Sequence, residues 1–403
     1  MVSLPVWRMS AEHQLGITLA LLAFLFVGLA SACDDDGGSR MPSSRDPVPP
    51  GDPVAGREIF RFDTFGDERF WTDTLRMHEV IQSAVDPLTA LAVGLKVDAD
   101  ALPPGILGQV DLTDPATTVA LLELDAVVGL QAEVVDGRIE RVGVTCALCH
   151  SDVDDSVQEG IGRRLDGHPN RDLDPGRILS LSPALQDAAV QAVLTSWGPG
   201  MYDAYWNHDG LNDPTVIPPA YGLNGVPVET FTGEGPVSYW NAYVAVTQMH
   251  GQGSFLDPEL GIDIDASPDL VTPKLPDLQA YQLTIPAPEP PAGSFDPEAA
   301  ERGELVFTGQ GGCASCHIPP TFTDAGERVH APSETGTDPL LAERGTTGGY
   351  RTTPLRGVWQ HPPYFHDGSA GTLEEVVDHY DAFLGLGLSP QQKADLVEYL
   401  KSL

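Results

Sequence analysis

Cys146-Ala-Leu-Cys-His150 and Cys313-Ala-Ser-Cys-His317 are two copies of one pattern, C-x-x-C-H. In each copy two thiols lie three residues apart and a histidine follows directly. This spacing lets two cysteines reach the vinyl groups on one edge of a porphyrin while the adjacent histidine binds the iron. We therefore predict two covalently bound c-type haems. The predicted attachment residues are Cys146, Cys149, His150, Cys313, Cys316 and His317.

The cysteines allow two other interpretations, a redox disulfide and half of a zinc site. The chain has five cysteines, and neither motif is followed by the further cysteines that a zinc site would need. Two motifs of the same kind favour haem attachment over both alternatives. The fifth cysteine, Cys33, is left for another use.

The chain carries 58 acidic and 22 basic residues in a total of 403, a formal net charge of −36. A surface of this charge repels phosphate, which argues against a nucleic-acid partner. It attracts basic proteins, and small soluble redox carriers are one such class. The alternative is that the acidity serves only solubility. The length and the hydrophobic fraction of 41% suit about two globular domains.

The N-terminus predicts export. Leu15 to Ala30 is an apolar run of 16 residues, which suits a signal peptide (residues 1–32) and is short for a membrane span. Ala30-Ser-Ala-Cys33 resembles a bacterial lipobox, although the usual leucine lies one place further back, at Leu29. We expect lipidation at Cys33 and a periplasmic, membrane-anchored protein. The alternative is cleavage near Ala32, which would release a soluble periplasmic protein.

Composition divides the mature chain into segments. Residues 33–55 are rich in Asp, Gly, Ser and Pro and predict a flexible tether. A proline-rich break at 285–297 predicts a linker, because proline continues neither a helix nor a central strand. One haem motif lies on each side of this break. We therefore expect a first haem domain at 56–284 and a second at 298–403.

The second domain begins and ends with expected helices. Residues 297–307 are helix-like and run into the haem motif. The last helix is predicted to start at Ser389-Pro390, with Ser389 as N-cap and Gln392 completing a capping box. Ala394, Val397 and Leu400 fall on one face, which we expect to pack against the first helix.

The first domain partly repeats the second. Gly56-Arg-Glu-Ile-Phe60 matches Gly303-Glu-Leu-Val-Phe307 in its glycine and its phenylalanine, but a much longer segment separates it from its haem motif. That insertion contains an expected β-hairpin, 127–135 and 138–145, turning at Asp136-Gly137. The predicted fold class is mainly α, with two cytochrome c-like domains of which the first carries this insertion.

The text from Thr353 to Tyr380, TPLRGVWQHPPYFHDGSAGTLEEVVDHY, carries a family resemblance. With the second haem motif it resembles the C-terminal domain of bacterial dihaem cytochrome c peroxidases and MauG-type enzymes. The resemblance covers roughly 298–403, and the first domain does not follow the family pattern. It implies an enzyme that reduces hydrogen peroxide at one haem with electrons relayed through the other. The alternative is a non-catalytic dihaem electron-transfer protein.

The sixth ligand of the second haem cannot be a methionine of its own domain, because all six methionines precede residue 250. The resemblance to MauG-type enzymes favours Tyr380, at the place where typical peroxidases carry methionine. The other candidates in this domain are His330, His361, His366 and His379. The remaining alternatives are a group from the first half and no sixth ligand at all. We expect His366, in a turn, to bond the backbone or a haem propionate instead.

The first haem has several candidate sixth ligands. Met249 and His250 follow an expected helix at 239–248 that could lie along a haem face. The remaining candidates are His168, Met201 and His208. Peroxide chemistry also needs an acid–base group, for which Glu229 and Glu234 are available. The family resemblance adds Ca²⁺ as a further candidate cofactor.

Overall fold

Several helices begin at the dipeptide Asp-Pro. In the computed structural model, which describes residues 44–403 apart from the Leu107 side chain, the aspartate caps the first turn by accepting a backbone N–H. The proline then occupies a position whose N–H would have no partner in the helix. Helices of this kind are α2 (Pro53–Phe62), α4 (Pro87–Ala92), α5 (Pro115–Glu123), α7 (Pro175–Ser180) and α12 (Pro297–Thr308).

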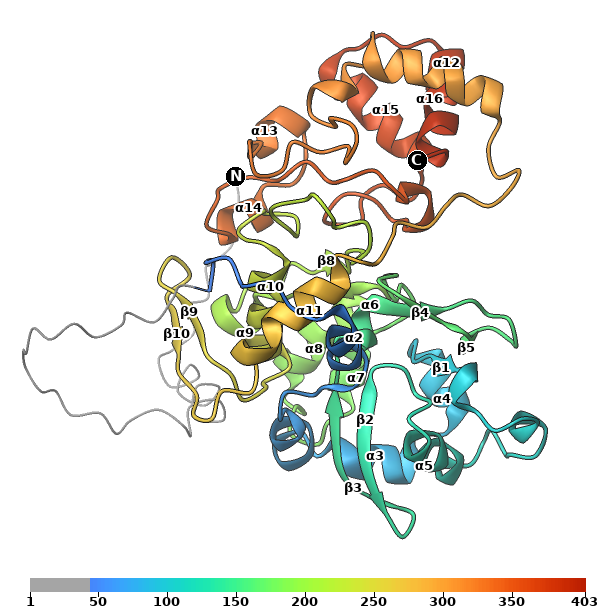
Figure 1. Ribbon diagram of the computed structural model, residues 1–403, viewed down its shortest axis with the longest axis vertical. Helices are drawn as coiled ribbons and strands as arrows, with labels where there is room; N and C mark the ends of the chain where they lie inside the picture. Colours follow the sequence, from blue (N-terminus) through green and yellow to red (C-terminus); the bar gives the residue numbers. More distant parts are fainter. Residues whose placement is uncertain (1–43) are drawn as a thin grey trace, which may run out of the picture. The chain divides into compact units, whose positions relative to one another are not determined.

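The remaining helical segments are distributed along both halves (Figure 1). In the first half they are η1 (Arg69–Thr74), α3 (Met77–Ala84), η2 (Ala99–Ala101), η3 (Ile106–Gly108), α6 (Ala147–His150), α8 (Ala188–Trp197), α9 (Trp206–Asp209), α10 (Val237–Tyr243), η4 (Val244–Gln248), η5 (Thr272–Lys274) and α11 (Leu275–Gln282). In the second half they are η6 (Cys313–Ser315), α13 (Pro332–Thr335), α14 (Leu340–Arg344), η7 (Val358–Gln360), α15 (Leu373–Leu384) and α16 (Pro390–Lys401).

All sheets of the described residues are two-stranded, so the mainly α prediction is confirmed. The predicted hairpin is present as β2 (Leu130–Val135) and β3 (Arg138–Val144), and Asp136 and Gly137 take the positive φ values of its turn. The other pairs are β1 (Val97–Asp98) with β5 (Ile161–Gly162), β4 (Ser151–Val153) with β6 (Arg164–Asp166), β7 (Met201–Tyr202) with β8 (Thr215–Val216), and β9 (Phe255–Asp257) with β10 (Ile262–Ile264).

Each half contains a pair of helices whose backbones touch at a glycine. In the pair α12–α16, a Cβ added to Gly303 would lie 2.0 Å from the carbonyl oxygen of Asp395. In the pair α2–α11, a Cβ added to Gly56 would lie 1.9 Å from the carbonyl oxygen of Asp277. No larger residue fits at these crossings, so the repeated glycine seen in the sequence has a packing reason in both halves.

The same pairs repeat an aromatic contact. The rings of Phe307 and Tyr399 are edge-to-face with centroids 5.1 Å apart, and those of Phe60 and Tyr281 are edge-to-face at 5.6 Å. Phe60 and Phe307 are both fully buried. Such contacts add to the free energy of burying the rings. The first half thus contains a helix pair built like the terminal pair of the second half.

The buried face of α16 differs from the prediction in one residue. Ser389 caps the helix with the expected capping box, and Val397 and Leu400 are buried as expected. Ala394, however, is exposed. Asp395 is buried in its place, because its carboxylate binds Arg302 of α12 through two hydrogen bonds of 3.0 and 2.8 Å.

The described part of the expected tether is held against the first half. Ser44 donates its N–H to Leu256 O, and Arg45 forms an ion pair with Asp257 at 2.8 Å. The expected signal peptide and Cys33 lie outside the described residues. Within residues 44–403 no helix combines the length and the hydropathy of a membrane span.

A buried carboxyl group fastens the hairpin to the start of η1. Both oxygens of Asp67 accept from the Val144 N–H, at 3.3 and 3.2 Å, and the side chain is fully buried. Burial raises the pKa of Asp67 to about 9, against the lowering effect of this hydrogen bond. Asp67 is therefore a neutral carboxylic acid at pH 7.

Gly303→Ala should destabilise the protein by about 1–3 kcal/mol, because the new methyl group meets backbone that cannot move aside without separating α12 from α16. The gain in helix propensity, about 1 kcal/mol, offsets only part of this loss. Urea unfolding measures the difference. Gly108→Ala is the control, since a Cβ there meets nothing within 4 Å and should change stability by less than about 0.5 kcal/mol.

The stability of the Asp67→Asn variant relative to the wild type should increase as pH rises. The folded pKa of Asp67, about 9, exceeds the ordinary value of 3.8, so the folded state holds a proton that the unfolded state has lost between these values. Wild-type stability therefore falls relative to the variant by on the order of 1 kcal/mol per pH unit. Thermal unfolding from pH 5 to pH 8 measures this, and parallel curves for the two proteins would contradict it.

Candidate haem-attachment sites

The first C-x-x-C-H motif follows the hairpin. Thr145 N–H binds Gly129 O at 3.0 Å, and Asn170 N–H binds Cys149 O at 2.9 Å, so the motif is fixed at both ends. Gly129 has a φ of +82°, and a Cβ there would lie 2.2 Å from the Cα of Leu148. The hairpin therefore approaches the motif as closely as backbone allows.

The second motif follows α12. Cys313 begins η6, which is entered through Gly312 with a φ of +65°, and Cys316 follows its last residue. The His317 N–H closes the turn on Cys313 O at 2.9 Å. Both cysteines of each motif are partly buried and none forms a disulfide. The interpretation as redox disulfides is therefore not supported by the geometry.

Both motif histidines are oriented in the same way. His150 Nδ1 lies 3.1 Å from Pro218 O, and His317 Nδ1 lies 3.0 Å from Phe322 O. A carbonyl can only accept, so Nδ1 carries the hydrogen and the Nε2 lone pair is the one that can bind a metal. Burial lowers the pKa of His150 to about 4, and it also lowers that of His317. Both rings are thus neutral, as iron ligands must be.

Three of the four motif thiols have raised pKa values. Burial raises the pKa of Cys146 and Cys149 to about 12 and that of Cys313 to about 11. Thiols of this pKa are not ionised at pH 7, which disfavours disulfide exchange. The free cysteines and the oriented histidines together fit covalent haem at both motifs.

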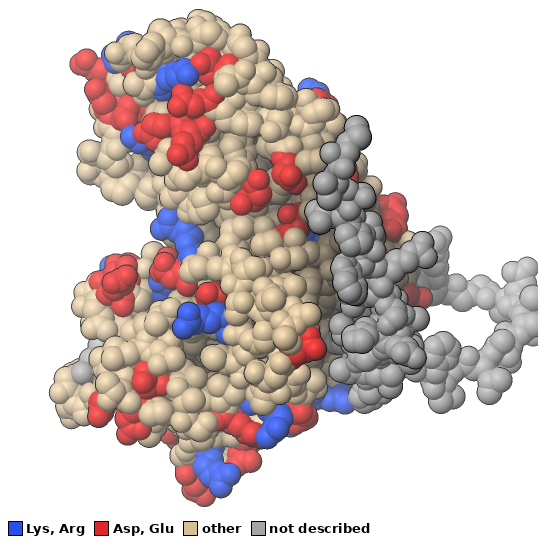
Figure 2. All heavy atoms as spheres, turned by 180° about the vertical axis from the view of Figure 1, so that it is seen from behind, with Lys and Arg blue, Asp and Glu red and all other residues tan. Residues whose placement is uncertain are grey.

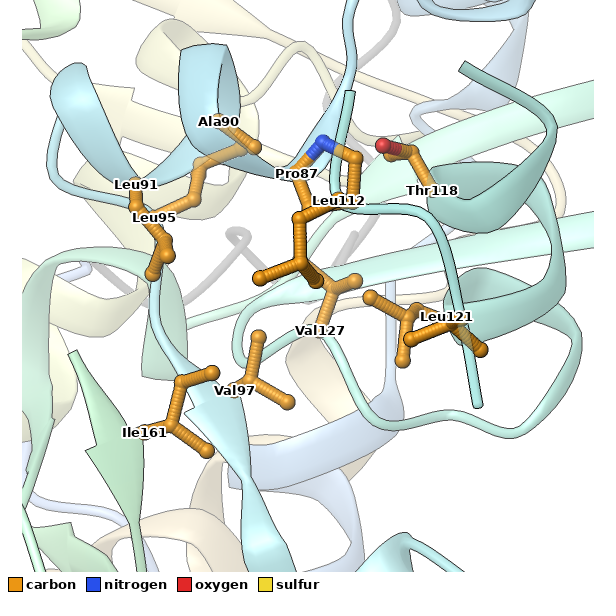
Figure 3. A pocket seen from close by; sticks show the side chains of 11 residues that line it. Pro87, Ala90, Leu91, Leu95, Val97, Leu112, Thr118, Leu121, Val127 and Ile161 are labelled. Carbon is orange, nitrogen blue, oxygen red and sulfur yellow. The ribbon is translucent and has the colours of Figure 1, made fainter. Parts of the chain in front are cut away.

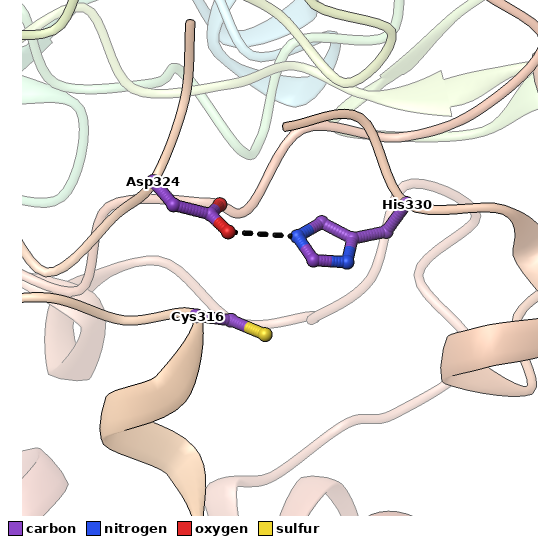
Figure 4. A group of neighbouring side chains, drawn as sticks. All are labelled: Cys316, Asp324 and His330. Atoms are coloured by element: carbon purple, nitrogen blue, oxygen red, sulfur yellow. Dashed lines mark hydrogen bonds and ion pairs between the residues drawn. The ribbon is translucent and has the colours of Figure 1, made fainter. Parts of the chain in front are cut away.

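A carboxylate–histidine group lies beside the second motif (Figure 4). The ligand atoms of Cys316, Asp324 and His330 lie within 4.8 Å of one another. His330 Nε2 is 3.0 Å from Asp324, and its Nδ1 is 3.4 Å from Glu334. Because both ring nitrogens face carboxylates, the structure does not favour His330 as an iron ligand.

The other candidates around the second motif separate clearly. Burial, and then the neighbouring Cys313 and Cys316 groups, raise the pKa of Tyr380 to about 12. The Tyr380 side chain therefore lies close to both cysteines. The Nε2 of His379 is 2.8 Å from Thr335 O, and that of His366 is 3.1 Å from the Tyr350 hydroxyl. Tyr380 is thus the candidate that the structure brings to the motif, and its ligation remains a prediction.

The candidates for the first haem do not converge on one residue. His208 and His250 line the same open cavity of about 190 Å³, whereas Met249 is buried in the core that also includes Cys146. The His250 ring stacks on Phe70 with centroids 3.8 Å apart. His168 and Met201 are partly buried. The identity of this ligand stays a prediction.

The two candidate acid–base groups differ in their surroundings. The oxygens of Glu234 accept from Tyr205, Thr232 and Thr346, so this carboxylate is fully engaged. Glu229 has one oxygen 3.3 Å from Arg351 and the other without a partner among the described residues. Burial, opposed by the Arg351 charge, raises the pKa of Glu229 to about 7. Glu229 is the one suited to give and take a proton near neutral pH.

An arginine that the sequence did not single out joins the two halves. The Arg344 side chain is 2% exposed, and its guanidinium lies 2.8 Å from Asp203 and 2.7 Å from Asp209. It also reaches the carbonyl of Asp213 at 3.3 Å. The Arg344 cation therefore lies among the carboxylates of Asp203, Asp209 and Asp213. Ca²⁺ remains a prediction.

The predicted insertion encloses a cavity of about 20 Å³ (Figure 3). Its walls are apolar side chains of α4, α5 and the neighbouring loops, and Val97, Val127 and Ile161 close one side. A cavity of this size holds no more than a water molecule, and water needs polar partners. This cavity is a packing defect of the insertion, not a ligand site.

Known proteins resemble parts of the chain. The RoxA-like, cytochrome c-like family model matches residues 349–381. The methylamine utilization protein MauG of Methylorubrum extorquens is 33% identical over 120 residues, 26% of this chain and 34% of that protein. The cytochrome-c peroxidase IdrP1 of Denitromonas iodatirespirans is 30% identical over 151 residues, 26% of this chain and 40% of that protein. The chain thus spans little more than a third of these relatives.

Among solved structures, hydrazine synthase of Kuenenia stuttgartiensis is 20% identical, with a TM-score of 0.33 over 49% of this chain and 74% of that one. A MauG-like protein associated with microbial copper homeostasis is 22% identical, with a TM-score of 0.33 over 47% of this chain and 73% of that one. A TM-score of 0.33 is too low for a conclusion about the fold or function of this chain. The sequence matches confirm the predicted relationship: the chain is similar to MauG and to cytochrome c peroxidases.

Proposed function

We propose that this chain is an exported dihaem c-type cytochrome that reduces hydrogen peroxide at one haem with electrons relayed through the other. The observation that carries the proposal is the shared orientation of His150 and His317, each with Nδ1 on a backbone carbonyl and each in a motif whose two cysteines form no disulfide. The similarity to MauG and to cytochrome c peroxidases supports haem-based redox chemistry.

The helix pairs support a two-domain cytochrome arrangement. α2 and α11 meet through Gly56 as α12 and α16 meet through Gly303, and each pair belongs to the half that contains one motif. We infer that each half is a cytochrome c-like domain around its own haem, and that the segment with β2 and β3 is an insertion into the first.

The chain's own residues would hold and adjust the cofactors. Haem, when bound, supplies one-electron chemistry and an iron coordination position. Cys146, Cys149 and His150 would hold the first haem. Cys313, Cys316, His317 and Tyr380 would hold the second. Glu229, with one free oxygen and a raised pKa, would move protons.

The partner and the location are part of the proposal. Carboxylates are spread over the face shown in Figure 2, with one group in the C-terminal region at the top. Together with the charge of −36, they suit a small, basic redox carrier as electron donor. We propose a periplasmic protein anchored through a lipid on Cys33, with soluble periplasmic protein as the alternative.

Protein matured in a host that attaches haem should gain the mass of two haems and consume peroxide after reduction. His150→Ala should remove the iron ligand of one haem and lower turnover at least tenfold, while His78→Ala, outside both motifs, should leave it unchanged. Mass spectrometry and a peroxide assay measure these effects. If both irons keep six ligands in every redox state and peroxide persists, the chain is an electron-transfer protein without catalysis.

Tyr380→Phe should alter the electron paramagnetic resonance signal of one haem only, because the phenol oxygen near Cys313 and Cys316 is lost while the ring remains. Tyr399→Phe is the matched control, since Tyr399 packs its ring on Phe307 in the contact of α12 with α16. Identical spectra for wild type and Tyr380→Phe would exclude Tyr380 as a ligand.

A further inference from the structure

Three buried side-chain nitrogens without hydrogen-bond partners come from two segments far apart in the sequence. Among the described residues, five buried side-chain nitrogens have no hydrogen-bond partner, and three of them are His168 Nδ1, Arg171 Nε and Trp359 Nε1. A buried N–H without an acceptor costs about 1–3 kcal/mol, so such atoms are rare unless something else accepts from them.

The three residues belong to one region at the junction of the halves. The His168 ring lies 5.3 Å from that of Tyr221, whose hydroxyl donates to Gly357 O, two residues before Trp359. The Arg171 charge extends across the same junction, because burial and then this charge lower the pKa of His361 to about 4.

This region adjoins the first motif. The segment that carries His168 and Arg171 is bonded to the motif backbone on both sides of His168, through Gly167 N–H to His150 O at 2.8 Å and Asn170 N–H to Cys149 O at 2.9 Å. The backbone that carries His168 and Arg171 is therefore in direct contact with the backbone of the first motif.

The region lacks a negatively charged partner for Arg171. No carboxylate of a described residue lies within ion-pair distance of Arg171. The carboxylates nearest to His168 are already engaged, Asp166 by Arg61 at 2.6 Å and Asp152 by Lys96 at 3.3 Å. The Arg171 guanidinium, the Trp359 N–H and the Nδ1–H tautomer of His168 together match a carboxylate, which accepts several hydrogen bonds.

We propose that Arg171, His168 and Trp359 form a carboxylate site that holds a propionate of the haem attached at Cys146 and Cys149. The inference rests on the proposed haem attachment and goes beyond it, because it fastens the first haem to a residue of the second half. Arg171 is a positioning residue in this site, and it balances the propionate charge inside the protein.

The test is a spectroelectrochemical titration of the holoprotein. Arg171→Gln leaves the propionate charge unbalanced, which disfavours the reduced haem. We expect the ratio of reduced to oxidised first haem at a fixed potential to fall about tenfold, a shift of ~59 mV to more negative potential. Arg171→Lys should restore most of this, and Trp359→Phe should give a smaller shift of the same sign.

Arg163→Gln is the matched control, since Arg163 has a 69% exposed side chain paired with Asp154 and should leave both potentials unchanged. Wild-type potentials should not depend on added acetate or phosphate. Unchanged potentials in Arg171→Gln, or a dependence on added anion that marks a site for free anions, would overturn the inference. Wild-type protein that lacks the mass of the first haem would instead overturn the proposed function.

Discussion

The contact between two helix backbones at a glycine is the constraint on which each half of this protein depends. Gly303 against Asp395 and Gly56 against Asp277 bring their helices closer than any side chain would allow. This closeness permits Phe307 and Phe60 to be fully buried against the partner helix. The two halves share this helix packing, whereas the segments that connect the helices differ between them. Those connecting segments contain the predicted insertion and the residues at the junction of the halves.

The sequence predicted features that depend on local spacing. The C-x-x-C-H motifs, the hairpin with its Asp136-Gly137 turn and the capping box of Ser389 are set by residues a few positions apart, and the structure contains each of them. The relationship to MauG and cytochrome c peroxidases also followed from a short text after Thr353.

Features that depend on distant residues were missed or wrong. Ala394 was expected inside because it is apolar, but the pairing of Asp395 with Arg302 decides which face is buried. The partner of α2 was not predicted, although a signal existed: Asp277-Leu-Gln-Ala-Tyr281 repeats the pattern of Asp395-Leu-Val-Glu-Tyr399. Arg344 and Arg171 carried no local signal, since the groups that surround them lie in other parts of the chain.

The buried Arg344 shows how a chain with few cations uses them. With 58 acidic residues against 22 basic ones, the two halves would repel each other wherever their surfaces meet. The Arg344 guanidinium, from the second half, forms ion pairs with Asp203, Asp209 and Asp213 of the first half. These pairs offset the mutual repulsion of the three carboxylates and attract the two halves to each other. Because the Arg344 and Asp203 side chains are only 2% and 1% exposed, their attraction should persist at ionic strengths that abolish surface pairing. The same acidic composition therefore gives a negatively charged surface and, around one buried arginine, an attraction between the two halves.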